Sequence, residues 1–219
     1  MNSSVRTLVL LAVAGGMFAN PQAKAAESHE WKIDSAHTNA EFGVKHMMIS
    51  TVKGNFQKVS GTAEYDGKNV KSIKVDATID ATSITTGNED RDKHLKGSDF
   101  FDVEKYPKIT FVSKKAIPAG KGKFKLQGDL TMHGVTKPVT LEVEGPSPEI
   151  KDKKGNAKVG AQASAKVNRK DFGINFGGVM DNGGALVGDD VNIDLSIELS
   201  ELPAKKSSGE ESEKKAASK

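Results

Sequence analysis

Histidine is the residue type in this sequence best suited to metal binding or proton transfer, but its spacing offers no local metal site. None of the histidines stands four residues from another, the spacing that places two ligands on one helix face. A metal site would need distant residues such as His46 and His133 to converge, and buried hydrogen-bonded histidines explain the pattern equally well. We therefore expect no metal. The five are His29, His37, His46, His94 and His133.

The sequence gives little support for nucleophilic or acid–base catalysis. No G-x-S-x-G elbow is present, and the glycine-rich stretch near Gly177 lacks the lysine–serine ending of a phosphate-binding loop. Arg91, Asp92 and His94 could in principle exchange protons. We favour the interpretation that these charges cap and brace a short helix, with Arg91 paired to a nearby carboxylate. The sequence predicts no catalytic residue.

Composition excludes several further classes of protein. The chain of 219 residues has no cysteine, so disulfides, thiolate metal sites and cysteine nucleophiles are excluded. Its net charge of +3 is small and evenly spread, and no basic stripe carries interleaved aromatic residues. We therefore expect no nucleic-acid partner. The oligomeric state is left open, a dimer included.

The N-terminus resembles an export signal. Arg6 precedes an apolar run of about 12 residues, too short to span a bilayer, and Ala23-Lys24-Ala25 matches a small-x-small cleavage site. We predict a signal peptide over residues 1–25, removed after Ala25. The signal does not separate the periplasm from the outside space, and we expect the periplasm.

The elements that must position any site are strands. From Glu30 to about Ser200, apolar and polar residues alternate in many short runs separated by turn-rich segments. Such alternation indicates antiparallel strands with one wet face. About eight of them would close into a barrel or fold into a sandwich, and we favour the barrel over residues 26–202. The clearest runs are 40–44, 73–79, 124–132, 139–143, 159–167 and 191–199.

Three segments break the alternation. Between Gly87 and Pro107, Asn88 can cap a short helix, and aromatic residues follow, which indicates an insertion over one barrel end. The glycine-rich stretch 171–190 is typical of a mobile loop. Residues 203–219 form a charged tail that we predict to be disordered.

The width of the barrel interior decides between a solid core and a ligand cavity. Several inward positions, such as Ala40, Ala161 and Ala163, are small and would leave room. The alternative is that phenylalanines such as Phe42 and Phe124 fill the space. An apolar lumen without a catalytic group would suit a long hydrocarbon, since each buried methylene contributes roughly 0.8 kcal/mol.

Eight sequence blocks stand out, in order along the chain. They are DSAHT (Asp34–Thr38), FGVKH (Phe42–His46), VKGNF (Val52–Phe56), ITTGN (Ile84–Asn88), RDKHL (Arg91–Leu95), DFFDVEKYP (Asp99–Pro107), GDLTMHGVTKPV (Gly128–Val139) and NRKDFG (Asn168–Gly173). Together they resemble the YceI-like family of periplasmic polyisoprenoid-binding proteins. The resemblance covers about Trp31 to Leu199.

The resemblance implies an all-β, extended antiparallel lipocalin-like barrel of about eight strands with a short helical insertion. Its apolar tunnel would hold a polyisoprenoid lipid or isoprenoid quinone, with no established enzymatic activity and no cofactor beyond that ligand. Residues implied to line the tunnel are Phe42, Val44, Phe56, Ile73, Val75, Ile79, Phe111, Leu126, Leu130 and Met132. Residues implied to lie toward one end are Arg91, His94, Phe100, Phe101 and Phe172.

Two alternatives stay open beside a periplasmic carrier. One is a lipid-modifying enzyme with His94 or His133 as the general base. The other is an accessory protein that delivers quinone to a membrane cytochrome through a transient membrane or cytochrome contact. This chain departs from the family pattern in its glycine-rich segment 176–188 and its lysine-rich tail, where such docking would occur.

Overall fold

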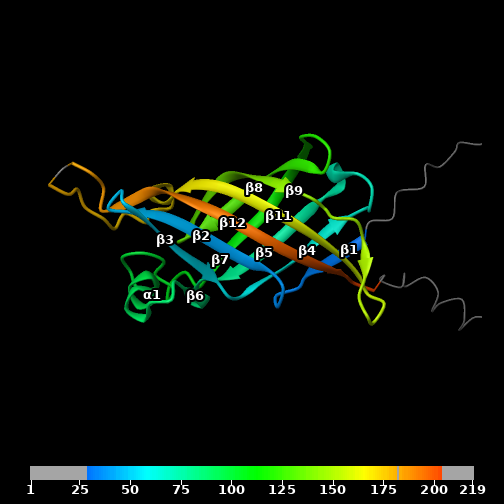
Figure 1. Ribbon diagram of the computed structural model, residues 1–219, viewed down its shortest axis with the longest axis horizontal. Coiled ribbons are helices and arrows are strands. Elements are labelled where there is room, and N and C mark those ends of the chain that lie inside the picture. Colours follow the sequence, from blue (N-terminus) through cyan, green and yellow to red (C-terminus); the bar gives the residue numbers. More distant parts are fainter. Residues whose placement is uncertain (1–28, 182, 204–219) are drawn as a thin grey trace, which may run out of the picture.

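The alternating runs form long antiparallel strands that close into a barrel in the computed structural model (Figure 1). The structure describes residues 29–181 and 183–203. The predicted signal peptide and residues 204–219 of the predicted tail lie outside that part of the chain. Within it, no helix has the length and apolar composition needed to cross a bilayer.

Eight strands close the barrel, which confirms the predicted fold class. Each pairs antiparallel with the next, and the pairing of β11 and β12 over residues 158–168 and 190–200 completes the ring. In order around the ring they are β1 (His29–Ile33), β4 (Val59–Tyr65), β5 (Lys74–Asp80), β7 (Lys108–Pro118), β8 (Lys123–Met132), β9 (Val135–Glu144), β11 (Ala157–Asn168) and β12 (Val187–Glu201).

Further short strands extend the wall at one end. β2 (Asn39–His46) pairs with the first half of β12, β3 (Ser50–Phe56) pairs with β2, and β6 (Ile84–Thr85) pairs with β3. The remaining strand, β10 (Ile150–Lys151), pairs with β11 near the opposite end. The barrel is therefore longer than its closed ring.

Three neighbouring strands are interrupted at the same level. Because β1 and β2 both lie against β12, they form one long strand broken by the turn at residues 34–38. The break between β3 and β4 falls at residues 57–58, and a 3-10 helix at Ala81–Ser83 separates β5 from β6. Gln57 N donates to Ser83 O at 3.2 Å, which joins two of these breaks.

The predicted helical insertion is confirmed as α1 (Glu89–Lys96), beside β6 in Figure 1. The Asn88 side chain accepts a hydrogen bond from Arg91 N at 2.9 Å, and acidic residues occupy the first turn, where they favour the helix dipole. Phe101, just after the helix, packs edge-on against Phe56 of β3 at 5.6 Å. The insertion thus joins the wall at the end formed by β2, β3 and β6. Two other 3-10 helices span Val70–Ser72 and Arg169–Phe172.

Candidate functional site

An apolar tunnel of about 480 Å³ runs along the barrel. Its wall reaches from Trp31, Tyr65 and Val159 near one end to His94 and Leu186 near the other. The β12 residues in the wall run from Val187 to Leu199, which corresponds to about 40 Å of strand at roughly 3.4 Å per residue. This volume is typical of small-molecule sites. Spread over such a length, it fits a slender chain.

The tunnel stays open because glycines accommodate the large rings. A Cβ atom on Gly54 would lie 2.5 Å from the Phe42 ring, and one on Gly128 would lie 2.5 Å from the Phe111 ring. Both rings therefore lie directly over bare backbone at the wall. Ala161 and Ala163 also line the tunnel, as the sequence predicted. The alternative of a core filled by phenylalanine is wrong.

One buried polar atom in the tunnel wall has no partner. Among side chains of the described residues, Trp31 Nε1 is the buried nitrogen or oxygen atom without a hydrogen bond. Trp31 is 3% exposed and packs with Ala63, Ala157 and Val159, with Tyr65 alongside. Burial raises the pKa of Tyr65, which keeps its hydroxyl protonated. An indole N–H without an acceptor is costly to bury.

The other end carries an aromatic cluster that joins α1 to the glycine-rich loop. The His94 ring packs edge-on between Phe100 at 5.0 Å and Phe176 at 4.7 Å, while its Nε2 atom lies 3.0 Å from Asp99 Oδ2. Arg91 Nε donates to Thr86 Oγ1 at 2.7 Å. The expectation that Arg91 pairs with a carboxylate is wrong. Its guanidinium donates to the hydroxyl and carbonyl oxygens of Thr86, while the neighbouring Asp92 carboxylate accepts from Thr85 and Thr86.

A buried arginine, Arg169, joins the two ends of the glycine-rich loop by hydrogen bonds. Arg169 donates to Ile174 O at 2.7 Å, where the loop leaves β11, and to Gly188 O at 2.9 Å, where the chain enters β12. Its guanidinium also lies 3.2 Å from Asp189 Oδ1. Burial lowers the pKa of Arg169, and Asp189 opposes that shift. These bonds fix the two ends of the loop side by side.

Most of the site residues implied by the family resemblance line this one tunnel. The exception is Phe172, the last residue of the 3-10 helix Arg169–Phe172, which is 1% exposed and belongs to the buried core cluster instead of the tunnel wall. Whether the others contact a ligand stays a prediction. Those in the wall are Phe42, Val44, Phe56, Ile73, Val75, Ile79, Arg91, His94, Phe100, Phe101, Phe111, Leu126, Leu130 and Met132.

The sequence analysis missed many wall residues, and three of them, Trp31, Arg169 and Phe176, are instructive. Trp31 alternates with Ile33 at the start of the first strand, a signal that could have placed it inside. Arg169 and Phe176 gave no such signal, because they lie in or beside irregular segments without periodicity.

The residues considered for acid–base or metal chemistry do not converge. Asp92 accepts hydrogen bonds from Thr85 and Thr86, whereas His94 pairs with Asp99. His133 lies in the turn between β8 and β9, and its Nδ1 atom is 3.1 Å from Phe172 O. His46 is the last residue of β2 and lines the tunnel wall.

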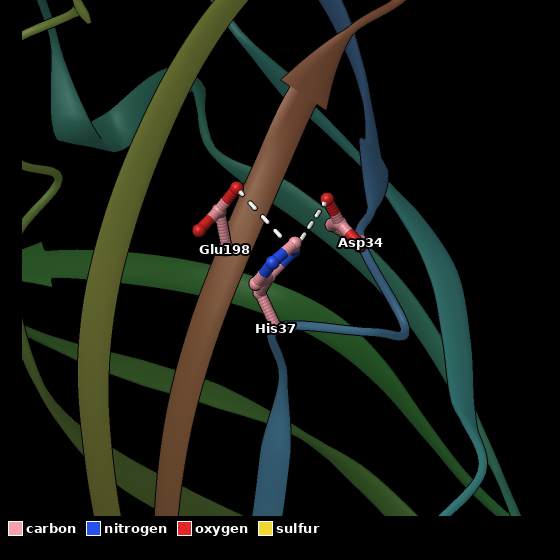
Figure 2. Close-up of side chains that lie close together, drawn as sticks. All are labelled: Asp34, His37 and Glu198. Atoms are coloured by element: carbon pink, nitrogen blue, oxygen red, sulfur yellow. Dashed lines mark hydrogen bonds and ion pairs between the residues drawn. The ribbon is translucent and has the colours of Figure 1, made fainter. Parts of the chain in front are cut away.

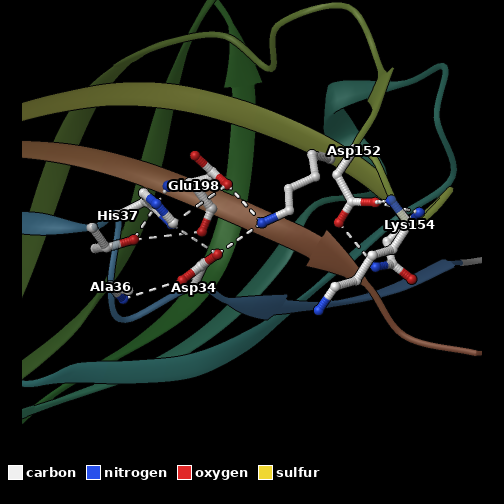
Figure 3. Close-up of polar contacts among 9 residues, drawn as sticks. Asp34, Ala36, His37, Asp152, Lys154 and Glu198 are labelled. Atoms are coloured by element: carbon white, nitrogen blue, oxygen red, sulfur yellow. Dashed lines mark hydrogen bonds and ion pairs between the residues drawn. The ribbon is translucent and has the colours of Figure 1, made fainter.

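A different polar cluster lies at the break between β1 and β2 (Figures 2 and 3). Figure 2 shows His37 between Asp34 and Glu198. Its Nδ1 atom lies 3.1 Å from Asp34 Oδ2 and 3.9 Å from Glu198 Oε1. These three have the ligand types of a metal site, and their ligand atoms lie within 4.8 Å of one another. However, Lys158 Nζ lies 2.8 Å from Asp34 and 2.7 Å from Glu198. The ammonium group already forms ion pairs with both carboxylates, so the cluster is an ion-pair network.

The network has a clear electrostatic effect. Hydrogen bonds from Lys158 and then His37 hold the pKa of Asp34 well below its usual range, and both carboxylates raise the pKa of Lys158. Ala36 N also donates to Asp34 at 3.1 Å, as Figure 3 shows. The cluster fastens the 34–38 turn to β11 and β12.

Fold and tunnel together define a closed antiparallel β-barrel with an enclosed apolar interior, the class whose lumen holds either side chains or one slender ligand. Within that class the family is specific. The model of the YceI-like domain matches residues 31–199, and the chain belongs to this family.

Known proteins are similar over most of the described chain. UPF0312 protein SAS2572 of Staphylococcus aureus MSSA476 is 38% identical over 167 residues, 76% of this chain and 95% of that protein. The crystal structure of Campylobacter jejuni YceI is 34% identical with a TM-score of 0.61, covering 73% of this chain and 90% of that one. Burkholderia cenocepacia BcnA is 26% identical with a TM-score of 0.65, covering 76% and 98%. A polyisoprenoid binding domain from Saccharophagus degradans shares the fold, at 14% identity and a TM-score of 0.58, covering 78% and 98%.

Proposed function

We propose that this protein is a periplasmic carrier that binds one isoprenoid lipid in its tunnel. The observation that carries the proposal is the slender apolar cavity of about 480 Å³ along the barrel. Burial of a long hydrocarbon there would contribute roughly 0.8 kcal/mol per methylene. A lipid so enclosed can travel through water.

The comparisons support this class of ligand. The S. degradans domain, which has the same fold, is described as polyisoprenoid binding. An isoprenoid chain is flexible and narrow, and it suits a wall of aliphatic and aromatic side chains such as Ile193, Leu195 and Phe111.

The unpartnered Trp31 Nε1 favours a ligand with an oxygen-bearing head group. A quinone carbonyl at the β1 end would accept this hydrogen bond, with the prenyl chain extending toward α1. We therefore propose an isoprenoid quinone over a plain hydrocarbon.

A binding role is favoured over a catalytic one. His94, one of the two candidate bases, pairs with Asp99 and packs edge-on against Phe100 and Phe176. These contacts suit a ring that closes one end of the tunnel.

Displacement of a fluorescent polyene fatty acid tests the proposal. The competitors are a four-isoprene quinone and squalene, which has no oxygen. We expect both to displace the probe from one site per chain. In Trp31→Phe, quinone affinity should fall about five- to tenfold, as expected for one lost hydrogen bond, while squalene affinity stays within about twofold. If neither competitor displaces the probe, the lipid-carrier proposal is wrong; equal loss for both would refute only the head-group assignment.

A further inference from the structure

Exposed apolar side chains of the described residues gather at one end of the barrel. Of seven large hydrophobic residues that are exposed, five lie in two adjacent segments. Met47, Met48 and Ile49 form the tip of the β2–β3 hairpin, and Phe176 and Val179 belong to the 173–186 loop. Ile49 and Val179 are 82% and 80% exposed. We call Met47–Ile49 together with Val179 the apolar tip.

The two segments are held together by backbone contacts. Met47 N donates to Leu186 O at 2.8 Å, and His46 pairs with Val187. Val179 forms a bridge with Ala185 that folds the loop back on itself. In Figure 1 both segments project from the end that carries α1, away from β1. The apolar tip is therefore one composite surface.

The backbone conformation of the hairpin tip is unfavourable for the residues found there, which argues for a role other than stabilising the fold. Met47 and Met48 have φ of 52° and 60°, and Ile49 N donates to His46 O at 3.1 Å to close the turn. Asn-Gly is the preferred pair in a turn with two positive φ values. Two exposed methionines gain little from burial in the folded chain and strain its backbone, so a partner that covers them would explain their presence.

The charge around the tip favours an anionic partner. Residues 42–56 contain Lys45 and Lys53 and no carboxylate, and residues 173–188 contain Asp181 as their one charged residue. The carboxylates that follow, Asp189 and Asp190, are paired with Lys170 and Lys166. Apolar side chains flanked by lysine are typical of segments that enter the interface of an anionic bilayer.

We propose that the apolar tip inserts into the surface of an anionic phospholipid membrane and holds the α1 end of the tunnel against it. His46, Phe176 and Leu186 belong to the tunnel wall and adjoin the tip, so a lipid could pass between bilayer and tunnel with little exposure to water. The purpose of docking rests on the proposed carrier function, whereas membrane binding itself does not.

Vesicle flotation tests the proposal. The full protein is mixed with vesicles of phosphatidylethanolamine and phosphatidylglycerol, or of phosphatidylcholine alone. We expect flotation with the anionic vesicles. Met47→Asn/Met48→Gly should lower the partition coefficient at least about tenfold, since each methionine that enters the bilayer contributes roughly one decade of affinity. Ile49→Ser/Val179→Ser should act alike. Val112→Thr and Ile150→Thr, at exposed apolar positions elsewhere, should float as the wild type does.

Three outcomes would overturn the proposal: no flotation of the wild type, equal flotation of the tip variants, or a wild-type dimer in sedimentation that the tip variants lose. The last would assign the tip to contact between copies.

Leu195→Trp, which blocks the tunnel, separates the two proposals. We expect it to float while it binds no lipid. Flotation of a wild type that takes up no lipid would support docking and contradict the carrier function.

Discussion

At the scale of single residues, the smallest side chains determine what the interior can hold. Gly54 and Gly128 lie beneath the Phe42 and Phe111 rings, where any Cβ atom would push a ring away from the wall. Alternation in the sequence predicted which residues face inward. It did not predict how the rings lie, because ring placement depends on glycines in neighbouring strands.

The Lys158 network predicts a pH-dependent contribution to stability. Asp34 has a lowered pKa in the folded protein, so its contribution is complete above its unfolded pKa of about 4 and is lost as pH falls toward the folded value. Lys158→Met should therefore lower the urea midpoint at pH 6. This deficit should shrink as the pH is lowered from about 5 toward 2.

Lys154→Met is the matched control, because it removes the same charge from the neighbouring turn. A deficit that is independent of pH, or one that Lys154→Met reproduces, would contradict the role assigned to the network. The sequence did not reveal this cluster, because Asp34, Lys158 and Glu198 are far apart along the chain and meet only through strand pairing.

At the scale of elements, periodicity predicted the long strands well but missed their interruptions. The prediction of about eight strands agrees with the closed ring, and Asn88 correctly marked the start of α1. The break at residues 34–38 was not foreseen, because β1 and β2 are recognisable as one strand only through their shared partner β12. The glycine-rich stretch was placed at 171–190, yet β12 already begins at Val187.

Arg169 is predicted to keep the 173–186 loop in place. Arg169→Met would leave the carbonyls of Ile174 and Gly188 without their donors, at a cost of about 2–4 kcal/mol. Hydrogen exchange should accelerate at amides 175–186 more than in β8 and β9. Lys170→Met, which removes an exposed charge beside it, should change neither quantity appreciably; similar effects in both variants would argue against the stapling role.

The β2–β3 hairpin predicts an unusual gain in stability. Met47→Asn/Met48→Gly replaces two strained residues with the pair preferred at positive φ, and should stabilise the protein by about 1–2 kcal/mol. Thermal unfolding would show a raised midpoint. An unchanged or lowered midpoint would mean that the turn is not strained. Loss of vesicle binding together with increased stability would separate docking from folding.

At the scale of the whole molecule, the two ends of the barrel differ in chemistry. The β1 end combines the unpartnered Trp31 N–H with the Lys158 network on the outside. The α1 end combines the aromatic cluster around His94 with the apolar tip. This polarity suggests an order of events in which a lipid enters at α1 and its head group reaches Trp31.

The central claim is that the tunnel holds one isoprenoid lipid, and native mass spectrometry of the protein purified without detergent tests it most directly. Leu195 lies midway along the tunnel, and Leu195→Trp should block it at a stability cost of about 1–3 kcal/mol. Asp194→Trp, which faces outward on the same strand, is the matched control. We predict one bound prenyl lipid per chain in the wild type and in Asp194→Trp, and none in Leu195→Trp. A wild type that carries no lipid, and takes none up from quinone-bearing vesicles, would contradict the claim.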